Sequence, residues 1–167
     1  MSTIALIGYR GSGKSTLGKW LAVELGVPFL DTDEKVLEHL GLDSVTEAWK
    51  SVGEEGWRAA ERAVIPQLLS HNGVIALGGG APMIEVIGKR LLTVPKVIHL
   101  WAESSVITDR LAEGNDRPAL AQDALEVMYR RLPEYAMIAS CSVDTSGDLD
   151  SSKSAILKAA TSPPKFI

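Results

Sequence analysis

The chain has 167 residues, of which 46% are hydrophobic and 23% charged, and its formal net charge is −4. This length and composition predict a single soluble globular domain over residues 1–167, and the negative charge argues against nucleic acid as a main partner. No apolar run approaches the roughly 20 residues of a membrane-spanning helix, so we expect no membrane partner. A single cysteine, Cys141, excludes an intrachain disulfide and favours a reducing cytoplasm.

The first predicted strand, Thr3–Ile7, runs directly into a glycine-rich loop. That loop, Gly8-Tyr9-Arg10-Gly11-Ser12-Gly13-Lys14-Ser15, fits the phosphate-binding pattern G-x-x-x-x-G-K-[ST]. A helical apolar repeat follows to Leu25, so the loop and the start of the helix can direct several backbone N–H groups at one anion. Lys14 would reach the β/γ-phosphates, and the Ser15 hydroxyl would reach Mg²⁺. A glycine-rich turn that matches by accident is the alternative, but the order strand, loop, helix favours a nucleoside triphosphate site.

Strands and helices alternate along the rest of the chain. The further strands expected are Val27–Leu30, Val74–Leu77, Val97–Trp101 and Ser142–Asp144. The further helices expected are Glu34–Leu40, a short one ending at Trp49, Glu55–Ser70, Pro82–Leu92, one ending at Leu111, Gln122–Arg131, Pro133–Ala139 and one ending at Ala160. Because the strands are too far apart for hairpins, they predict a parallel sheet with crossover helices. Such sheets bind ligands at the carboxyl ends of their strands.

Two carboxylates, Asp31 and Asp33, come directly after the second strand. In extended geometry, residues two apart lie on the same side of the chain. One carboxylate near a phosphate-binding loop can hold the water shell of Mg²⁺, and the second can orient or deprotonate a hydroxyl acceptor. The alternative is that Asp31 or Asp33 only caps the following helix.

Three glycines and several arginines complete the candidate site. Gly78-Gly79-Gly80 follows the third strand and predicts that a ligand approaches the backbone closely, unless the glycines form only a loose turn. Arginine suits planar, bidentate binding of carboxylate or phosphate. The candidates are Arg58, Arg110, Arg117, Arg130 and Arg131. Arg58 shares a helix face with Glu61, although a solvated surface pair explains that spacing equally well. Arg117 lies in a polar, turn-rich segment suited to a lid. Together these residues predict a small kinase acting on a small, anionic alcohol.

The three histidines show no spacing typical of a metal site. His39 and His71 fall at predicted helix ends or on the surface. His99 lies inside a predicted strand, so we expect it to be buried and hydrogen-bonded.

Taken in order, these motifs closely resemble those of the shikimate kinases. The matching motifs are Gly-x-x-Gly-Ser-Gly-Lys-Ser-Thr from Gly8, Asp31-Thr32-Asp33, Trp57-Arg58 with Glu61, Gly78-Gly79-Gly80, Arg117-Pro118, Arg131-x-Pro-x-Tyr135 and Val143-Asp144-Thr145. The resemblance runs from about residue 4 to 146. It implies an α/β P-loop NTPase of the nucleoside-monophosphate-kinase-like kind, a three-layer sandwich with a five-stranded parallel sheet of order 2-3-1-4-5. It also implies a lid at about 112–121 and a substrate-binding helical region at about 33–62.

The resemblance further implies ATP- and Mg²⁺-dependent phosphorylation of the 3-hydroxyl of shikimate, in the pathway to aromatic amino acids. By position, the shikimate ligands would be Asp33, Arg58, Gly79, Gly80 and Arg131, with Glu61 supporting Arg58. The catalytic residues would be Lys14, Asp33 and Arg117, and the Mg²⁺ ligands Ser15 and Asp31. The nucleotide would be bound by Gly11, Ser12, Gly13, Lys14, Ser15, Thr16, Arg110, Arg117 and Pro118. We expect a cytoplasmic monomer whose partners are small molecules.

Some positions depart from the family pattern. Trp57 stands where the family usually has phenylalanine, Ala119-Leu120 stands where two leucines are common, and Tyr9-Arg10 is a less usual filling of the loop. None of these departures removes a catalytic group. The alternatives are another small-metabolite P-loop kinase, such as a gluconate kinase, or a nucleotide-binding switch without turnover. A GTPase-like switch is disfavoured because the chain has no Asn-Lys-x-Asp motif for reading guanine.

Overall fold

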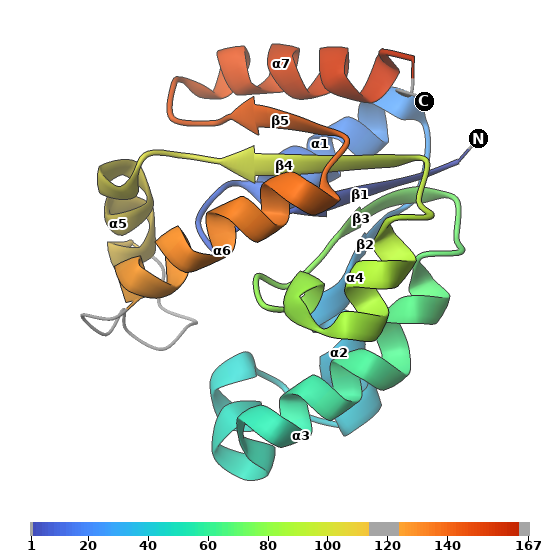
Figure 1. Ribbon diagram of the computed structural model, residues 1–167, viewed down its shortest axis with the longest axis vertical. Coiled ribbons are helices and arrows are strands. Elements are labelled where there is room, and N and C mark those ends of the chain that lie inside the picture. The colour runs from blue at the N-terminus through green and yellow to red at the C-terminus, as the bar shows by residue number, and fades with distance from the viewer. Residues whose placement is uncertain (1, 114–123, 164–167) are drawn as a thin grey trace.

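The computed structural model describes residues 2–113 and 124–163. One five-stranded sheet forms the centre, in the order β2-β3-β1-β4-β5. Its strands are β1 (Thr3–Ile7), β2 (Phe29–Asp31), β3 (Gly73–Ala76), β4 (Lys96–Trp101) and β5 (Cys141–Asp144). Every pairing between neighbouring strands is parallel. The parallel sheet and its 2-3-1-4-5 order are therefore confirmed (Figure 1).

Helices connect the strands and cover both faces of the sheet (Figure 1). In the described ranges they are α1 (Lys14–Leu25), α2 (Thr32–Leu40), α3 (Val45–Leu68), the short 3₁₀ helix η1 (Ala81–Met83), α4 (Glu85–Leu91), α5 (Ser104–Ala112), α6 (Ala124–Ile138) and α7 (Leu149–Thr161). None of the described helices combines the length and apolar composition needed to cross a bilayer.

The alternation of side chains along β1 divides the core into two layers. Ala5 and Ile7 belong to one buried cluster, to which α3, α4, α5 and α6 contribute Ile65, Ile87, Ile107 and Met128. Ile4 and Leu6 belong to the cluster on the opposite face, where α1 and α7 pack. Burying one such side chain contributes roughly 1.5–3 kcal/mol. The two layers therefore hold the sheet, and with it the carboxyl ends of its strands, as a rigid platform.

A third, smaller cluster lies between α2 and α3 and is built from Val36, Ala48, Trp57 and Ala60. Trp57, the departure from the family's usual phenylalanine, is only 3% exposed there, so it packs within this helical region. Gly53 interrupts α3 with φ 69° and ψ −178°, a conformation open to glycine. This break separates the two helices that the sequence predicted on either side of Gly53.

Several element boundaries differ from the predictions: β2 begins at Phe29, not Val27, and the helix expected over Pro82–Leu92 is divided at Ile84 into η1 and α4. Two further differences lie near the candidate site. α2 begins at Thr32, not Glu34, because the carboxylate of Asp31 caps it by accepting a hydrogen bond from the Asp33 N–H. Asp33 is therefore helical, and the extended geometry expected for Asp31 and Asp33 was wrong. Pro133 does not restart a helix but lies inside the continuous α6. The helix tolerates the lost N–H because Met128 and Tyr135 are buried on either side of it.

Candidate active site

The glycine-rich loop lies between the end of β1 and the start of α1, as predicted. Gly8 is tightly enclosed: its φ is +149°, and a Cβ there would collide with the Leu100 carbonyl. Gly13 adopts a left-handed conformation immediately before α1. Lys14, the first residue of α1, is buried, and its Nζ donates to the Gly8 and Tyr9 carbonyls at 2.6 and 3.0 Å. The ammonium group therefore sits inside the loop, where a bound phosphate would meet it.

Arg110, on α5, and Thr145, directly after β5, hold this loop in place. Arg110 Nη1 donates to the Gly11 carbonyl at 2.9 Å, and its Nη2 donates to the Thr145 carbonyl. The Thr145 hydroxyl donates to the Ser12 carbonyl at 2.6 Å. Thr145 is the last residue of the Val143-Asp144-Thr145 motif, and sequence reasoning gave it no role. The position of Thr145 in that motif, after the last strand, was the one sequence feature that could have pointed to a contact with the loop.

Ser15 and Asp31 meet at the start of α1. The Ser15 hydroxyl donates to Asp31 Oδ2 at 3.0 Å, while Asp31 Oδ1 accepts from the Asp33 N–H at 2.9 Å. Asp31 therefore caps α2 and also faces the phosphate-binding loop. The alternative that Asp31 caps the helix is confirmed, and it does not exclude a role at the phosphate site. A hydroxyl and a carboxylate oxygen side by side are the oxygen ligands that Mg²⁺ prefers. No group of three or more His, Cys, Asp or Glu suited to a metal is found in the described part of the chain.

The triple glycine lies where α2 and α3 approach the end of β3. A Cβ at Gly78 would overlap the Asp33 carboxylate, and one at Gly80 would overlap the Arg58 guanidinium. The sequence predicted that a ligand approaches these glycines closely. In the structure, the side chains of Asp33 and Arg58 make this close approach. Gly79 is less crowded, and Arg131 Nη1 lies 3.6 Å from the position of its missing Cβ. The glycines let a carboxylate and two guanidinium groups gather around one stretch of backbone.

Arg58 is held by a buried carboxylate. Its Nη1 lies 2.6 Å from Glu61 Oε1, and the Glu61 side chain is only 1% exposed. The reading of this pair as a solvated surface contact was therefore wrong. Glu54, which is 64% exposed, approaches the other nitrogen at 3.9 Å, and the Trp49 ring lies 5.9 Å away. Glu61 thus orients the Arg58 guanidinium, which lies directly against Gly80.

Burial raises the pKa of Glu61 from 4.5 to about 7, against the opposing effect of Arg58, and nearby Asp33 raises it further. Because the native carboxyl then holds its proton more tightly than the unfolded chain does, its contribution to stability falls as pH rises from about 4.5 to 7. Burial likewise lowers the pKa of His99 from 6.5 to about 4, with Lys14 adding to the effect. This second group acts in the opposite direction, because it adds stability as pH rises through 4 to 6.5.

We expect Glu61→Gln to remove the first of these two dependences. The unfolding free energy of the variant, minus that of the wild type, should rise by up to about 3 kcal/mol between pH 4.5 and 7 and then level off. His99 is present in both proteins, so its titration cancels in the difference. Chemical denaturation at a series of pH values measures this quantity, and a difference that stays constant with pH would contradict the shift.

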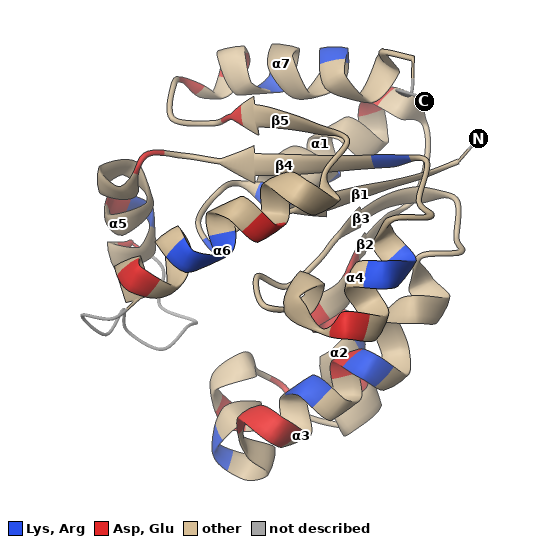
Figure 2. Cartoon of the chain, viewed as in Figure 1, with Lys and Arg blue, Asp and Glu red and all other residues tan. Residues whose placement is uncertain are grey.

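Arg131, on α6, reaches the same glycines from the opposite side. Its guanidinium carbon lies 5.9 Å from the centre of the Tyr9 ring, and the Tyr9 hydroxyl donates to the Ala124 carbonyl at 3.1 Å. Tyr9, an unusual residue at this position of the phosphate-binding loop, therefore packs against Arg131, which is predicted to bind the acceptor. Arg130 is exposed, as expected for one of the two neighbouring arginines. Figure 2 shows basic positions on both α3 and α6, the helices that bring these groups to the site.

His99 only partly follows its prediction. It is buried, with 4% exposure, and its ring centroid lies 5.1 Å from that of Tyr135. Its Nε2, however, has no hydrogen-bond partner among the described residues. The expected burial is confirmed, and the expected hydrogen bond is not found at this atom.

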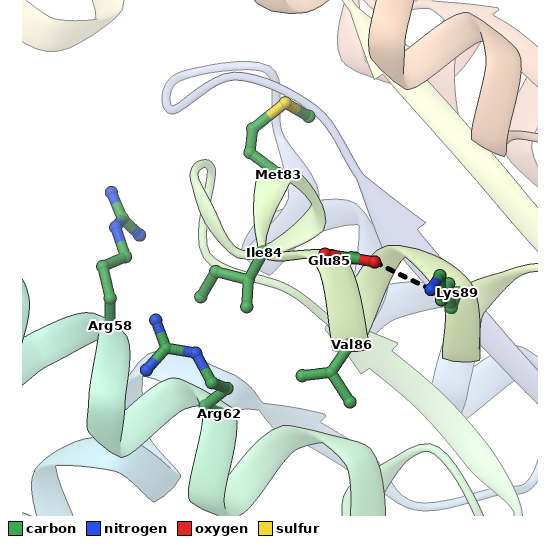
Figure 3. A pocket seen from close by; sticks show the side chains of 7 residues that line it. All are labelled: Arg58, Arg62, Met83, Ile84, Glu85, Val86 and Lys89. Atoms are coloured by element: carbon green, nitrogen blue, oxygen red, sulfur yellow. Dashed lines mark ion pairs between the residues drawn. The ribbon is translucent and has the colours of Figure 1, made fainter.

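A separate cavity of about 650 Å³ lies between α3 and the η1–α4 segment (Figure 3). It is lined by Arg58, Arg62, Met83, Ile84, Glu85, Val86 and Lys89. Glu85 and Lys89 pair with each other across 2.7 Å. Arg58 is the one predicted acceptor ligand in this lining, so the cavity adjoins the site without forming it. Arg117, Pro118 and almost all of the predicted lid lie outside the described residues.

Comparisons with known proteins agree with this geometry. The sequence model of the shikimate kinase family matches residues 10–161. A curated shikimate kinase of Frankia casuarinae is 37% identical over 165 residues, covering 96% of this chain and 72% of the relative. The chain belongs to the shikimate kinase family.

Solved structures agree with membership in the shikimate kinase family. The shikimate kinase from Acinetobacter baumannii, determined in complex with shikimate, superposes with a TM-score of 0.84 at 27% identity, covering 95% of this chain and 92% of the other. A gluconokinase from Sinorhizobium meliloti superposes with a TM-score of 0.60 at 22% identity, covering 95% and 90%, and this likeness shows the fold alone. As a member of the shikimate kinase family, the protein is a kinase with ATP as its phosphoryl donor.

Proposed function

We propose that the protein transfers the γ-phosphoryl group of ATP to the 3-hydroxyl of shikimate, with Mg²⁺ as the metal. The observation that carries this proposal is the convergence of Arg58, Arg131 and Asp33 on the triple glycine. Two guanidinium groups suit the carboxylate of the acceptor, and a carboxylate suits the hydroxyl that must attack. Membership in the shikimate kinase family supports the same acceptor.

On the donor side, the nucleotide phosphates occupy the loop and the start of α1. The groups that would bind them are the backbone of Gly11, Ser12 and Gly13, the Lys14 ammonium, and Ser15 and Thr16. Arg110 would border the adenine together with Pro118, which lies outside the described residues. The contacts of Arg110 with Gly11 and Thr145 fix it at the rim of the loop, and so support this position.

Mg²⁺ would be held by the Ser15 hydroxyl and by Asp31, directly or through water. Mg²⁺ keeps several waters and takes only one or two protein carboxylates when a substrate supplies phosphate oxygens, so this small ligand set fits the ion. Bound there, Mg²⁺ would neutralise charge on the phosphates. Asp31 fixes the position of Ser15 through its 3.0 Å hydrogen bond, so the two ligands are prearranged.

Asp31→Asn should therefore raise the Mg²⁺ concentration for half-maximal activity about 10-fold, since one charge-assisted contact worth roughly 1.4 kcal/mol is lost. Asparagine still caps a helix, so α2 should remain intact. The matched control is Asp148→Asn, which changes the exposed carboxylate that caps α7 and should leave the Mg²⁺ dependence unchanged. Equal Mg²⁺ requirements in the Asp31 variant and the wild type would remove Asp31 from the metal site.

On the acceptor side, Asp33 would orient the 3-hydroxyl and take its proton. Arg58 and Arg131 would bind the carboxylate, with Gly79 and Gly80 beside them and Glu61 supporting Arg58. Residues of about 33–62 would form the substrate-binding region, and the lid of about 112–121 would close over the phosphates and bring Arg117 to the transferring group. A single domain over 1–167 working as a cytoplasmic monomer remains our prediction.

A coupled assay of ADP release with shikimate, gluconate or no acceptor tests this function. We expect turnover with shikimate, and only background rates with gluconate and without acceptor. Turnover with gluconate alone would favour the other small-metabolite kinase, and ADP release indifferent to any acceptor would favour a nucleotide-binding protein without this transferase activity.

A further inference from the structure

The buried hydroxyl of Tyr135 joins α6 to the triple glycine. Tyr135 has no exposed surface, and its hydroxyl lies 2.5 Å from the Gly79 carbonyl oxygen, to which it donates. Arg131, one helical turn earlier on α6, places Nη1 3.6 Å from the position of the missing Gly79 Cβ. One hydroxyl therefore joins α6, the helix that carries the proposed carboxylate ligand Arg131, to the backbone of the triple glycine.

The hydrogen bond to the Gly79 carbonyl also sets the direction of the Gly80 N–H. The Gly79 carbonyl and the Gly80 N–H belong to one planar unit, and the described chain contains no cis peptide bond, so the two groups point in opposite directions. By drawing the carbonyl towards itself, Tyr135 turns the Gly80 N–H the other way. This N–H has no backbone acceptor among the described residues. The Arg58 guanidinium covers the Gly80 Cα, and Arg131 lies beside Gly79.

We propose that Tyr135 is a positioning residue for acceptor binding. Its hydroxyl fixes the Gly79–Gly80 peptide so that the Gly80 N–H acts as a third donor to the carboxylate of the acceptor, beside Arg58 and Arg131. This proposal deepens the proposed function and rests on it. Three donors arranged around one carboxylate would recognise its direction as well as its charge.

The surroundings of Tyr135 keep its hydroxyl protonated. Burial raises the pKa of the phenol to about 12, against the opposing effect of Arg131, so the hydroxyl remains a donor at the pH of any ordinary assay. The His99 ring packs against the phenol at 5.1 Å, and its own pKa, lowered by burial to about 4, keeps it neutral. Neither the phenol nor the His99 ring packed against it therefore changes charge between pH 5 and 9.

Tyr135→Phe removes the hydroxyl and keeps the ring. We expect KM for shikimate to rise about 10-fold, as for the loss of roughly one hydrogen bond, with KM for ATP changing less than about twofold. The methyl ester of shikimate lacks the charged carboxylate, so its KM should respond much less. The control is Tyr129→Phe, on the same helix but 57% exposed, which should match the wild type. An unchanged shikimate KM, or equal losses with acid and ester, would overturn the proposal.

A second measurement does not depend on turnover. In ¹H–¹⁵N spectra recorded without substrate, Tyr135→Phe should displace the Gly80 amide resonance and increase its motion, and an unaffected Gly80 amide would overturn the proposal even if the acceptor is not shikimate. In the wild type, shikimate should move the Gly80 amide proton downfield, and the absence of that shift contradicts its role as a donor. A wild type that phosphorylates only another acceptor would instead defeat the proposed function.

Discussion

Asp33→Asn should lower kcat for shikimate by at least about 10²-fold while leaving KM for ATP almost unchanged. General bases contribute roughly 10²–10⁴-fold to rate, and a loss of 10² corresponds to about 2.7 kcal/mol in the barrier. The Asp33 carboxylate lies against Gly78, on the acceptor side, whereas the nucleotide is held by the loop and Lys14. Steady-state kinetics with each substrate varied in turn separates the two effects.

The structure supplies a control for the alternative that Asp33 acts only on helix α2. Asp31 already caps that helix, and both Asp33 and Glu34 lie in its first turn. There each carboxylate interacts favourably with the helix dipole, to a similar extent. Glu34→Gln should therefore match any dipole effect of Asp33→Asn and keep normal turnover. Near-wild-type kcat in Asp33→Asn, or equal losses in both variants, would return Asp33 to a structural role.

Arg58→Ala should raise KM for shikimate by about 30-fold or more. Removing one partner of a buried, hydrogen-bonded charge pair costs roughly 2–5 kcal/mol. The Arg58 side chain is 18% exposed, so we expect the low end of that range, at 1.4 kcal/mol for each factor of ten. KM for ATP should stay nearly constant, because Arg58 lies on α3 and contacts the triple glycine, not the phosphate-binding loop. Arg58→Lys should recover only part of the loss, since an ammonium keeps the charge but not the planar fork.

The methyl ester of shikimate distinguishes a carboxylate ligand from a structural residue. It should be a poor substrate for the wild type and much less sensitive than shikimate to Arg58→Ala, because the interaction is already missing. Arg62→Ala, one turn further along α3 at an exposed position, is the matched control and should behave as the wild type. Equal losses for acid and ester would mean that Arg58 serves its pairing with Glu61 and not the acceptor.

Much of the fold was predictable because strand and helix periodicities are local. The alternating elements predicted a parallel sheet, and the resemblance to shikimate kinases supplied its order. Boundaries were less predictable where a side chain decides them. Asp31 ends β2 and caps α2 at once, which moved the helix start to Thr32, and the packing of Met128 and Tyr135 carries α6 through Pro133. These are tertiary effects that a propensity does not contain.

The candidate site was predictable in its members but not in its contacts. Lys14, Asp31, Asp33, Arg58 and Arg131 were named from motifs. The argument that placed Asp31 and Asp33 together, however, assumed an extended chain through Asp33, whereas β2 ends at Asp31 and Asp33 is helical. The burial of Glu61 could not be read from a helical spacing, which is the same for a solvated pair. The hydrogen bond of Tyr135 to Gly79 joins residues far apart in the sequence, and no local pattern reports such a contact.

The most direct test of the central claim is the identity of the product. Purified protein, incubated with ATP, Mg²⁺ and shikimate, should form one shikimate 3-phosphate for each ADP released, with the position of the phosphate read from ³¹P–¹H correlation spectra. Inorganic phosphate in place of a phosphorylated shikimate, or a phosphate on another hydroxyl, would contradict the proposed placement of Asp33 beside the 3-hydroxyl and of Arg58 and Arg131 on the carboxylate.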